Sequence, residues 1–276
     1  MSILSQVKNT ADSFAGVRIA VAGVEKIGKT TFTCGAPGVL LIPIESGFAG
    51  VEVQHVPMVT QYINFVDLLT EITASCKQGS FPFKTVVIDS VTALERLIHE
   101  GVLLSDPTYK GGLNKSVTMN SCLGGYGKGF DVANERFMEI IAMLDVLALQ
   151  HGINVVLTAH VFADQMLDPQ VGEYASWNIQ LHSPKNYKTF GKRELFLQWL
   201  DGIFFLHEPL IISEQHGISK GISENRGRVL GLSRTPSYIA GNRFGMEGEI
   251  NIPKEQGWNY LAHAMHESCG IDIYKR

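Results

Sequence analysis

A short glycine-containing stretch near the start of the chain constrains the fold more than any other feature. The apolar run VRIAVA, residues 17–22, is followed at once by GVEKIGKTTF, residues 23–32. Residues 23–30 match the pattern G-x-x-x-x-G-K-[ST], which requires a strand before it and a helix after it. The sequence therefore predicts a strand–loop–helix unit whose backbone amides surround a phosphate group. A surface turn rich in glycine and lysine is the alternative.

The polar residues of this stretch have distinct predicted roles. Lys29 is expected to reach the β- and γ-phosphates of a nucleotide, and the Thr30 hydroxyl is expected to bind Mg²⁺. The residues expected to form the nucleotide-binding loop are Gly23, Val24, Glu25, Lys26, Ile27, Gly28, Lys29, Thr30 and Thr31.

A second signal lies downstream, in the apolar run TVVIDS at residues 85–90. It places Asp89 at the end of a predicted strand, where a carboxylate is expected to hold the Mg²⁺ ion through water. A lone aspartate after an apolar run is commonly a strand-end cap. The two motifs together favour a nucleotide site over two unrelated local features.

Near-continuous apolar runs alternate with helical patterns along most of the chain. Such runs are typical of strands buried on both faces of a parallel sheet. Strands are predicted at 17–23, 38–45, 85–90, 153–160 and 202–208, and helices at 64–76, 91–104, 133–150 and 258–268. Long loops are expected at 105–131 and 161–190, and β-hairpins in the tail after residue 209, including 227–244. We therefore predict an α/β fold, a mostly parallel central sheet flanked by helices with C-terminal β-hairpins.

Composition excludes several classes of protein. The formal net charge is −4 over 276 residues, so a basic field over the whole surface is excluded and nucleic acid would need a local patch. The four cysteines are scattered, which argues against a disulfide framework and favours a reducing compartment. We expect neither a signal peptide nor a membrane span, and hence a cytoplasmic location.

Two kinds of P-loop protein fit the sequence less well. GTPases read guanine with an N-K-x-D segment, and the nearest match is NKSV at 114–117, with Val117 in place of the aspartate. Small-molecule kinases usually carry a mobile lid rich in arginine, but residues 105–131 contain none. GTP is therefore disfavoured, and a small-acceptor phosphotransferase is weaker but stays open.

The fuller pattern resembles the RecA-type P-loop ATPase core. The likeness rests on GVEKIGKTT, on LLIPIESG with Glu45, on VVIDSVTAL, on VVLTAH with His160, and on GNRFG with Arg243. More narrowly, GYGKGF, GINVVLTAH, WLDGIFFL and GNRFG resemble small phage RecA-like ATP-binding proteins, some linked to single-strand annealing and recombination. The resemblance covers most of 17–250. It implies a RecA-like core over 17–250, a polar lead-in at 1–16, and a short helix and tail at 251–276.

The resemblance also implies a catalytic set of Glu45, Lys29, His160 and Arg243. Glu45 would orient or deprotonate the attacking water. His160 has three interpretations: a sensor of the γ-phosphate, a switch for a DNA-binding loop, or a histidine at a strand end with no role in the reaction. Arg243, and less well Arg234, would reach the ATP of a neighbouring subunit, with a solvated hairpin face as the alternative. Gly241 departs from the family, whose hairpin has a basic residue at that position.

In RecA relatives, the loop after the sensor strand contacts single-stranded DNA. Here the two glycine- and aromatic-containing loops offer aromatic side chains that can stack on bases and lysines that can follow phosphates. The candidate DNA-binding residues are Tyr126, Lys128, Trp177, Lys185, Tyr187 and Lys188. Loop aromatics that pack back on the core are the alternative.

These observations favour an ATP-binding and ATP-hydrolysing RecA-like protein that uses Mg²⁺ and acts on single-stranded DNA. The resemblance implies a homo-oligomeric ring or filament, DNA-stimulated ATPase activity, a single-strand-binding or other recombination protein as partner, and the host cytoplasm if the protein is phage-encoded. Two alternatives stay open: an ATP-gated switch that binds a partner and has little affinity for DNA, and the small-acceptor phosphotransferase.

Overall fold

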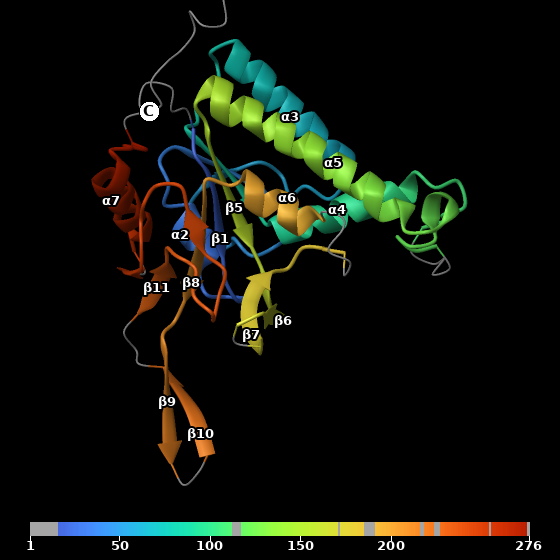
Figure 1. The fold of residues 1–276 in the computed structure, drawn as a ribbon. Helices are drawn as coiled ribbons and strands as arrows, with labels where there is room; N and C mark the ends of the chain where they lie inside the picture. The colour runs from blue at the N-terminus through green and yellow to red at the C-terminus, as the bar shows by residue number, and fades with distance from the viewer. Residues whose placement is uncertain are drawn as a thin grey trace, which may run out of the picture.

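A mostly parallel sheet forms the centre of the molecule (Figure 1). The computed structural model describes residues 16–111, 117–170, 172–184, 191–215, 218–223, 227–253 and 255–274. Within this part of the chain, nine strands form the main sheet in the order β13-β11-β8-β1-β5-β4-β2-β3, with β12 paired to β8. The strands from β8 to β3 are parallel, whereas β11, β12 and β13 run antiparallel to their neighbours.

The observed strands confirm those predicted for the parallel part of the sheet. The bounds are β1 Arg18–Ala22, β2 Val39–Pro43, β3 Gln54–His55, β4 Thr85–Asp89, β5 Asn154–Ala159, β8 Gly202–His207, β11 Arg228–Gly231, β12 Gly241–Asn242 and β13 Glu249–Ile252. Every residue of β2, β4 and β5 is buried, as expected for strands covered on both faces. The fold class is therefore the α/β architecture that the apolar runs predict.

Helices cover both faces of this sheet (Figure 1). They are α2 Lys29–Thr33, α3 Tyr62–Lys77, α4 Val91–Leu104, α5 Lys128–Asp145, α6 Lys192–Trp199 and α7 Gly257–Cys269, with a 3₁₀ turn at Cys122–Gly124 and a π-helical turn at Val146–Gln150. The helices predicted at 64–76, 91–104, 133–150 and 258–268 are all present, the third as α5 and its π-helical extension. In the described ranges, no helix is both long and apolar enough to cross a bilayer.

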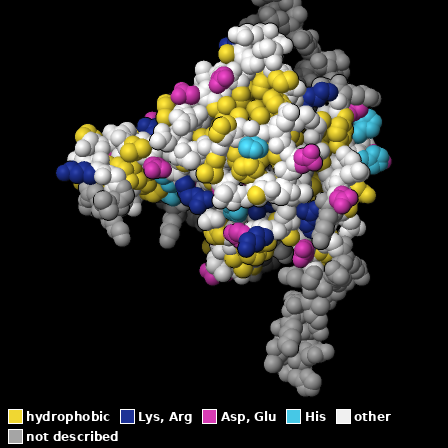
Figure 2. Space-filling view, turned by 180° about the vertical axis from the view of Figure 1, so that it is seen from behind, with side chains coloured by type: hydrophobic (Ala, Val, Ile, Leu, Met, Phe, Trp, Pro, Cys, Tyr) yellow, Lys and Arg dark blue, Asp and Glu magenta, His cyan; other side chains and the backbone are white. Residues whose placement is uncertain are grey.

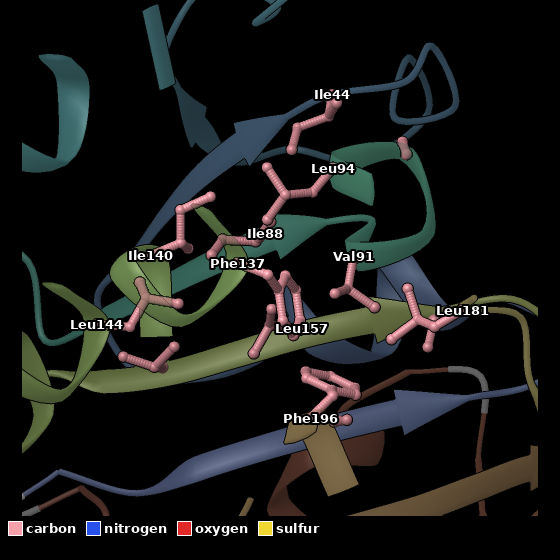
Figure 3. Close-up of a cluster of buried hydrophobic side chains, with 14 of the residues drawn as sticks. Ile44, Ile88, Val91, Leu94, Phe137, Ile140, Leu144, Leu157, Leu181 and Phe196 are labelled. Atoms are coloured by element: carbon pink, nitrogen blue, oxygen red, sulfur yellow. The ribbon is translucent and has the colours of Figure 1, made fainter. Parts of the chain in front are cut away.

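Two apolar cores lie on opposite faces of the sheet. In the larger core, α3, α4, α5 and α6 pack on side chains such as Ile88 and Leu157 (Figure 3). In the second core, α2 and α7 pack on Val87 and Val156 from the same two strands. Adjacent residues of one strand thus belong to different cores, because successive side chains of a strand point to opposite faces.

Three predictions about the loops and the tail are wrong in part. Residues 161–179 form an antiparallel hairpin of β6 Val161–Asp168 and β7 Gly172–Ile179, in place of a loop. Residues 128–131 of the predicted loop 105–131 belong to α5. In the tail, β11 pairs with β8 and β13, and β12 pairs with β8, so 227–244 forms no hairpin of its own. The same tail does contain a hairpin, as predicted: β9 Leu210–Gln215 and β10 Ile218–Ser223 pair with each other and extend from the body (Figure 1).

The hairpin at 161–179 has no clear signature in the sequence, for a physical reason. Side chains of intermediate exposure alternate with exposed ones along most of β6. A ribbon that is largely solvated on both faces does not need the apolar alternation by which strands are recognised in sequence. Its register is fixed by cross-strand backbone pairing instead.

Candidate active site

The loop between β1 and α2 has the shape that its two glycines permit. Gly28 immediately precedes α2 and has a φ of 95°, a left-handed conformation that favours glycine. At Gly23, an added Cβ would lie 2.5 Å from the carbonyl oxygen of Leu206 on β8. The first glycine is thus required by a close approach to the neighbouring strand and the second by a backbone turn.

The Lys29 side chain folds back over this loop. Its Nζ donates hydrogen bonds to the carbonyl oxygens of Gly23 at 2.9 Å and Val24 at 2.8 Å. The residue is only 6% exposed, and this burial lowers the pKa of Lys29, while the Asp89 carboxylate opposes the shift. A buried ammonium group is therefore held inside the loop, where the sequence predicts phosphate.

Asp89 lies beside the loop with both carboxylate oxygens engaged. One oxygen accepts a hydrogen bond from the Thr30 hydroxyl at 2.8 Å, and the other accepts one from the Thr158 hydroxyl. Asp89 is 4% exposed, at the end of β4. Oxygen donors grouped next to a lysine fit a hard cation such as Mg²⁺. No sequence motif marks Thr158 as part of the site, although it lies two residues before His160 on a predicted strand.

Glu45 and His160 are in direct contact. Glu45 follows β2 and His160 follows β5, and His160 Nε2 lies 2.8 Å from Glu45 Oε1. The hydrogen bond from His160 holds the pKa of the Glu45 carboxyl below its ordinary value, with Ser90 contributing in the same direction and partial burial opposing. Arg96 Nη2 lies 3.5 Å from the second carboxylate oxygen. Glu45 is therefore held ionised, with both of its oxygens near donors.

Two adjoining cavities open at this edge of the sheet. The first, of about 360 Å³, is lined by Glu25, Lys26, Gly28, Lys29, Thr30, Thr31, Glu45, Ser46, Gly47, Asp89 and His160. The second, of about 420 Å³, is lined by Glu25, Glu45, Thr92, Glu95, Arg96, His160 and Gln180. The cavities share Glu25, Glu45 and His160. The structure thus brings the predicted loop, metal and catalytic residues to one place, except for Arg243.

Comparison with known families agrees with this geometry. A family model described as an AAA domain matches residues 15–244. The chain belongs to the AAA domain family. This family comprises P-loop ATPases, so the predictions of a P-loop NTPase core, ATP binding and ATPase activity are confirmed at the level of the family. No curated protein matches the chain. The narrower likeness to phage RecA-like proteins stays a prediction.

Arg243 of this AAA domain lies at the other end of the sheet from the P-loop. It follows β12, which pairs with the first residues of β8, and β8 runs parallel to β1. Its Nη2 donates to the carbonyl oxygen of Gln198 at 2.8 Å, and Nη1 lies 3.3 Å from an Asp201 oxygen. Arg243 is thus remote from the P-loop of its own chain, and its predicted role requires a neighbouring subunit.

The predicted DNA-binding residues of the AAA domain are distributed over two segments. Trp177 is 38% exposed on β7, and Tyr126 is fully exposed just before α5. Lys128 is exposed at the start of α5. The other three candidates, Lys185, Tyr187 and Lys188, lie outside the described residues. The alternative to DNA binding, aromatic side chains that pack back on the core, does not apply to Tyr126, because its side chain is fully exposed.

Charged side chains on the face opposite to the view of Figure 1 are mixed in sign. Figure 2 shows Lys and Arg side chains interspersed with Asp and Glu and with apolar side chains. Among the described residues, which include His263, His266 and Cys269 of α7, no cluster of three or more His, Cys, Asp or Glu side chains could hold an ion. His263 instead lies 3.2 Å from Glu267 on the same helix.

Proposed function

We propose that this AAA domain hydrolyses ATP to control its grip on single-stranded DNA, in phage-type recombination, annealing or repair. The observation that carries the proposal is the position of His160. Its ring contacts Glu45, and its carbonyl oxygen accepts a hydrogen bond from the Gln180 amide at 2.9 Å. Residues 160 and 180 bracket the hairpin β6–β7, so His160 links the cavity beside the P-loop to the base of that hairpin.

The ATP half of the proposal assigns a role to each residue of the site. Lys29 and the loop amides bind the β- and γ-phosphates, and Glu45 orients or deprotonates the attacking water. Thr30 and Asp89 are the residues that would hold Mg²⁺, whose charge would offset that of the phosphates. Arg243 acts on the ATP of a neighbouring subunit in a ring or filament.

The DNA half of the proposal rests on exposed aromatic and basic residues near the hairpin. Trp177 offers an exposed ring for stacking on bases. The rings of Phe130 and His182 are stacked, with their centroids 3.9 Å apart. The start of α5, which carries Lys128, therefore lies beside the segment between the hairpin and residues 185–190. Tyr126, Lys185, Tyr187 and Lys188 complete the proposed DNA-binding set.

ATP turnover with and without oligo-dT tests the proposal. The wild-type chain should hydrolyse ATP, oligo-dT should raise the rate, and the ATP-dependent affinity for oligo-dT should fall steeply as salt rises. Lys29→Ala should abolish nucleotide binding, while Lys77→Ala, an exposed lysine at the end of α3, should not. Full turnover in Lys29→Ala would refute the nucleotide site. Turnover indifferent to oligo-dT, with no binding, would refute the DNA half alone.

The second cavity favours one other candidate function. A space of about 420 Å³ beside Glu45 and His160 has room for a small acceptor molecule. In that case the protein would transfer the γ-phosphate to the acceptor, with Glu45 as general base. The same assay separates the two candidates, because a phosphotransferase would turn over ATP only with its acceptor present and would ignore DNA.

A further inference from the structure

Arg228, which no sequence motif singles out, contacts the P-loop through the loop's backbone carbonyl oxygens. Arg228 is the first residue of β11, and it is 8% exposed. Its Nη1 donates to the carbonyl oxygen of Ile27 at 3.2 Å and to that of Gly28 at 3.3 Å. Its Nη2 donates to the carbonyl oxygen of Pro253 at 3.1 Å, just after β13. One guanidinium thus joins the P-loop to the antiparallel edge of the sheet.

The geometry of the peptide bond gives these contacts a consequence for phosphate binding. In a trans peptide, the C=O and N–H groups point in opposite directions. A guanidinium that fixes the carbonyls of Ile27 and Gly28 on one side therefore directs the next amides, those of Gly28 and Lys29, to the other side. Gly28 and Lys29 line the cavity of about 360 Å³, where the phosphates are expected.

Gly28 and Arg228 are fitted to each other. A Cβ added at Gly28 would lie 2.2 Å from Arg228 Nη1, so a side chain at this position would displace the guanidinium, and the φ of 95° itself favours glycine. Burial lowers the pKa of Arg228, and the Glu208 carboxylate opposes the shift. An arginine side chain stays protonated in proteins, so its positive charge lies behind the loop on the side away from the cavity.

We infer that Arg228 is a positioning residue for phosphate binding, which holds the P-loop amides toward the β-phosphate without touching the nucleotide. This inference rests on the proposed nucleotide site. The simpler alternative is that Arg228 only fastens β11 and β13 to the core. If Arg228 positions the P-loop, its loss would reduce the protein's preference for a nucleotide that carries a second phosphate. If Arg228 only fastens the strands, its loss would lower the stability of the fold alone.

The test compares the affinities of the full-length protein for ADP and AMP, measured by calorimetry, together with the melting temperature. Arg228→Met keeps most of the aliphatic stem and removes the donors, and Arg228→Lys keeps a charge but cannot reach three carbonyls at once. The matched control is Arg18→Met, because Arg18 bonds Asp145 and Asp201 at the opposite end of β1. Arg18 is also largely buried, with a side-chain exposure of 14%.

Arg228→Met should reduce the preference for ADP over AMP by about tenfold, the effect of weakening one amide–phosphate hydrogen bond when the loop amides are no longer held in place. Arg228→Lys should fall in between, and Arg18→Met should keep the wild-type preference despite a lower melting temperature. A wild-type ADP/AMP ratio in Arg228→Met would overturn the inference. If the wild-type protein itself showed no preference for ADP, the nucleotide site would fail instead.

Discussion

His160 Nε2 lies 2.8 Å from Glu45 Oε1, although the two residues are 115 positions apart in the chain. They follow β5 and β2, which are separated in the sheet by β4. The contact therefore crosses the end of β4, directly beside Asp89. Glu45, which is expected to act on the attacking water, is thus bonded to the residue that immediately precedes the hairpin β6–β7.

Glu45→Gln should separate ATP binding from hydrolysis. Glutamine keeps the shape of the side chain and an acceptor for His160, but it cannot take a proton or carry a charge. We expect the affinity for ATP to stay within a few-fold of wild type and the turnover rate to fall by about 10²-fold or more. Nucleotide titration and steady-state turnover measure the two quantities. Wild-type turnover in this variant would exclude Glu45 as the residue that activates water.

His160→Leu should move the acid limb of the pH–rate profile to higher pH. The hydrogen bond from His160 is the largest cause of the lowered pKa of Glu45. Without it, the Glu45 pKa rises, and protonation inactivates the carboxylate at a higher pH. As pH is lowered below about 6, the turnover of His160→Leu should therefore begin to decline at a higher pH than that of wild type. His160→Gln, which keeps a donor, serves as control, and coincident profiles for all three proteins would contradict the role given to this bond.

Thr158→Val should raise the Mg²⁺ concentration needed for ATP turnover. Valine keeps the volume and the β-branch but removes the hydroxyl that bonds Asp89, so the carboxylate loses one of its two side-chain partners. We expect the Mg²⁺ concentration needed for turnover to rise by about tenfold and the free energy of unfolding to fall by about 1–2 kcal/mol. Thr85→Val is the matched control, since Thr85 is equally buried at the other end of β4. It should lose stability with no change in the Mg²⁺ requirement.

Trp177→Ala should weaken binding of oligo-dT without reducing basal ATP turnover. A stacked base contributes about 1–3 kcal/mol, so the affinity should fall by about tenfold or more. The backbone bonds of residue 177 to Ser237 and Ile239 survive the substitution. Lys185→Ala with Lys188→Ala should reduce the salt dependence as well. Tyr260→Ala, an exposed aromatic residue on α7, is the control, and equal affinity in Trp177→Ala and the control would exclude the hairpin from DNA binding.

Acid should destabilise the protein in part through His99. Burial, with the charge of Lys192 and then His182 acting in the same direction, lowers the pKa of His99 to about 3. His99 Nε2 is 3.9 Å from Glu95, but the ring is neutral at pH 5 and makes no ion pair there. The unfolded chain binds a proton below about pH 6.5 and the folded chain does not, so stability falls as pH falls, by up to about 2 kcal/mol at pH 5.

Urea unfolding at pH 7 and pH 5 measures this dependence. His99→Leu should lose less stability between the two pH values than wild type, because the group that titrates in the unfolded chain is gone. His263→Leu, at an exposed position on α7, should behave like wild type. An undiminished loss in His99→Leu would show that other groups account for the acid sensitivity.

The P-loop and the parallel strands were predictable because their information is local. The order of glycine, lysine and threonine in residues 23–31 defines a loop whose shape depends on neighbours in the chain, and uninterrupted apolar runs define buried strands. The hairpin at 161–179 was not predictable, because its strands are mostly solvated and carry a weak apolar pattern.

The sequence by itself determined the α/β architecture, the phosphate-binding loop and the carboxylate at the end of β4. Only the tertiary structure decided which distant residues complete that site: Thr158 on Asp89, His160 on Glu45, and Arg228 behind Gly28. The strand order brings β2, β4 and β5 together and sets β11 beside β8. Pairing between strands far apart in the chain leaves no local periodicity, so a threonine, a histidine and an arginine acquire their partners only when the sheet is assembled.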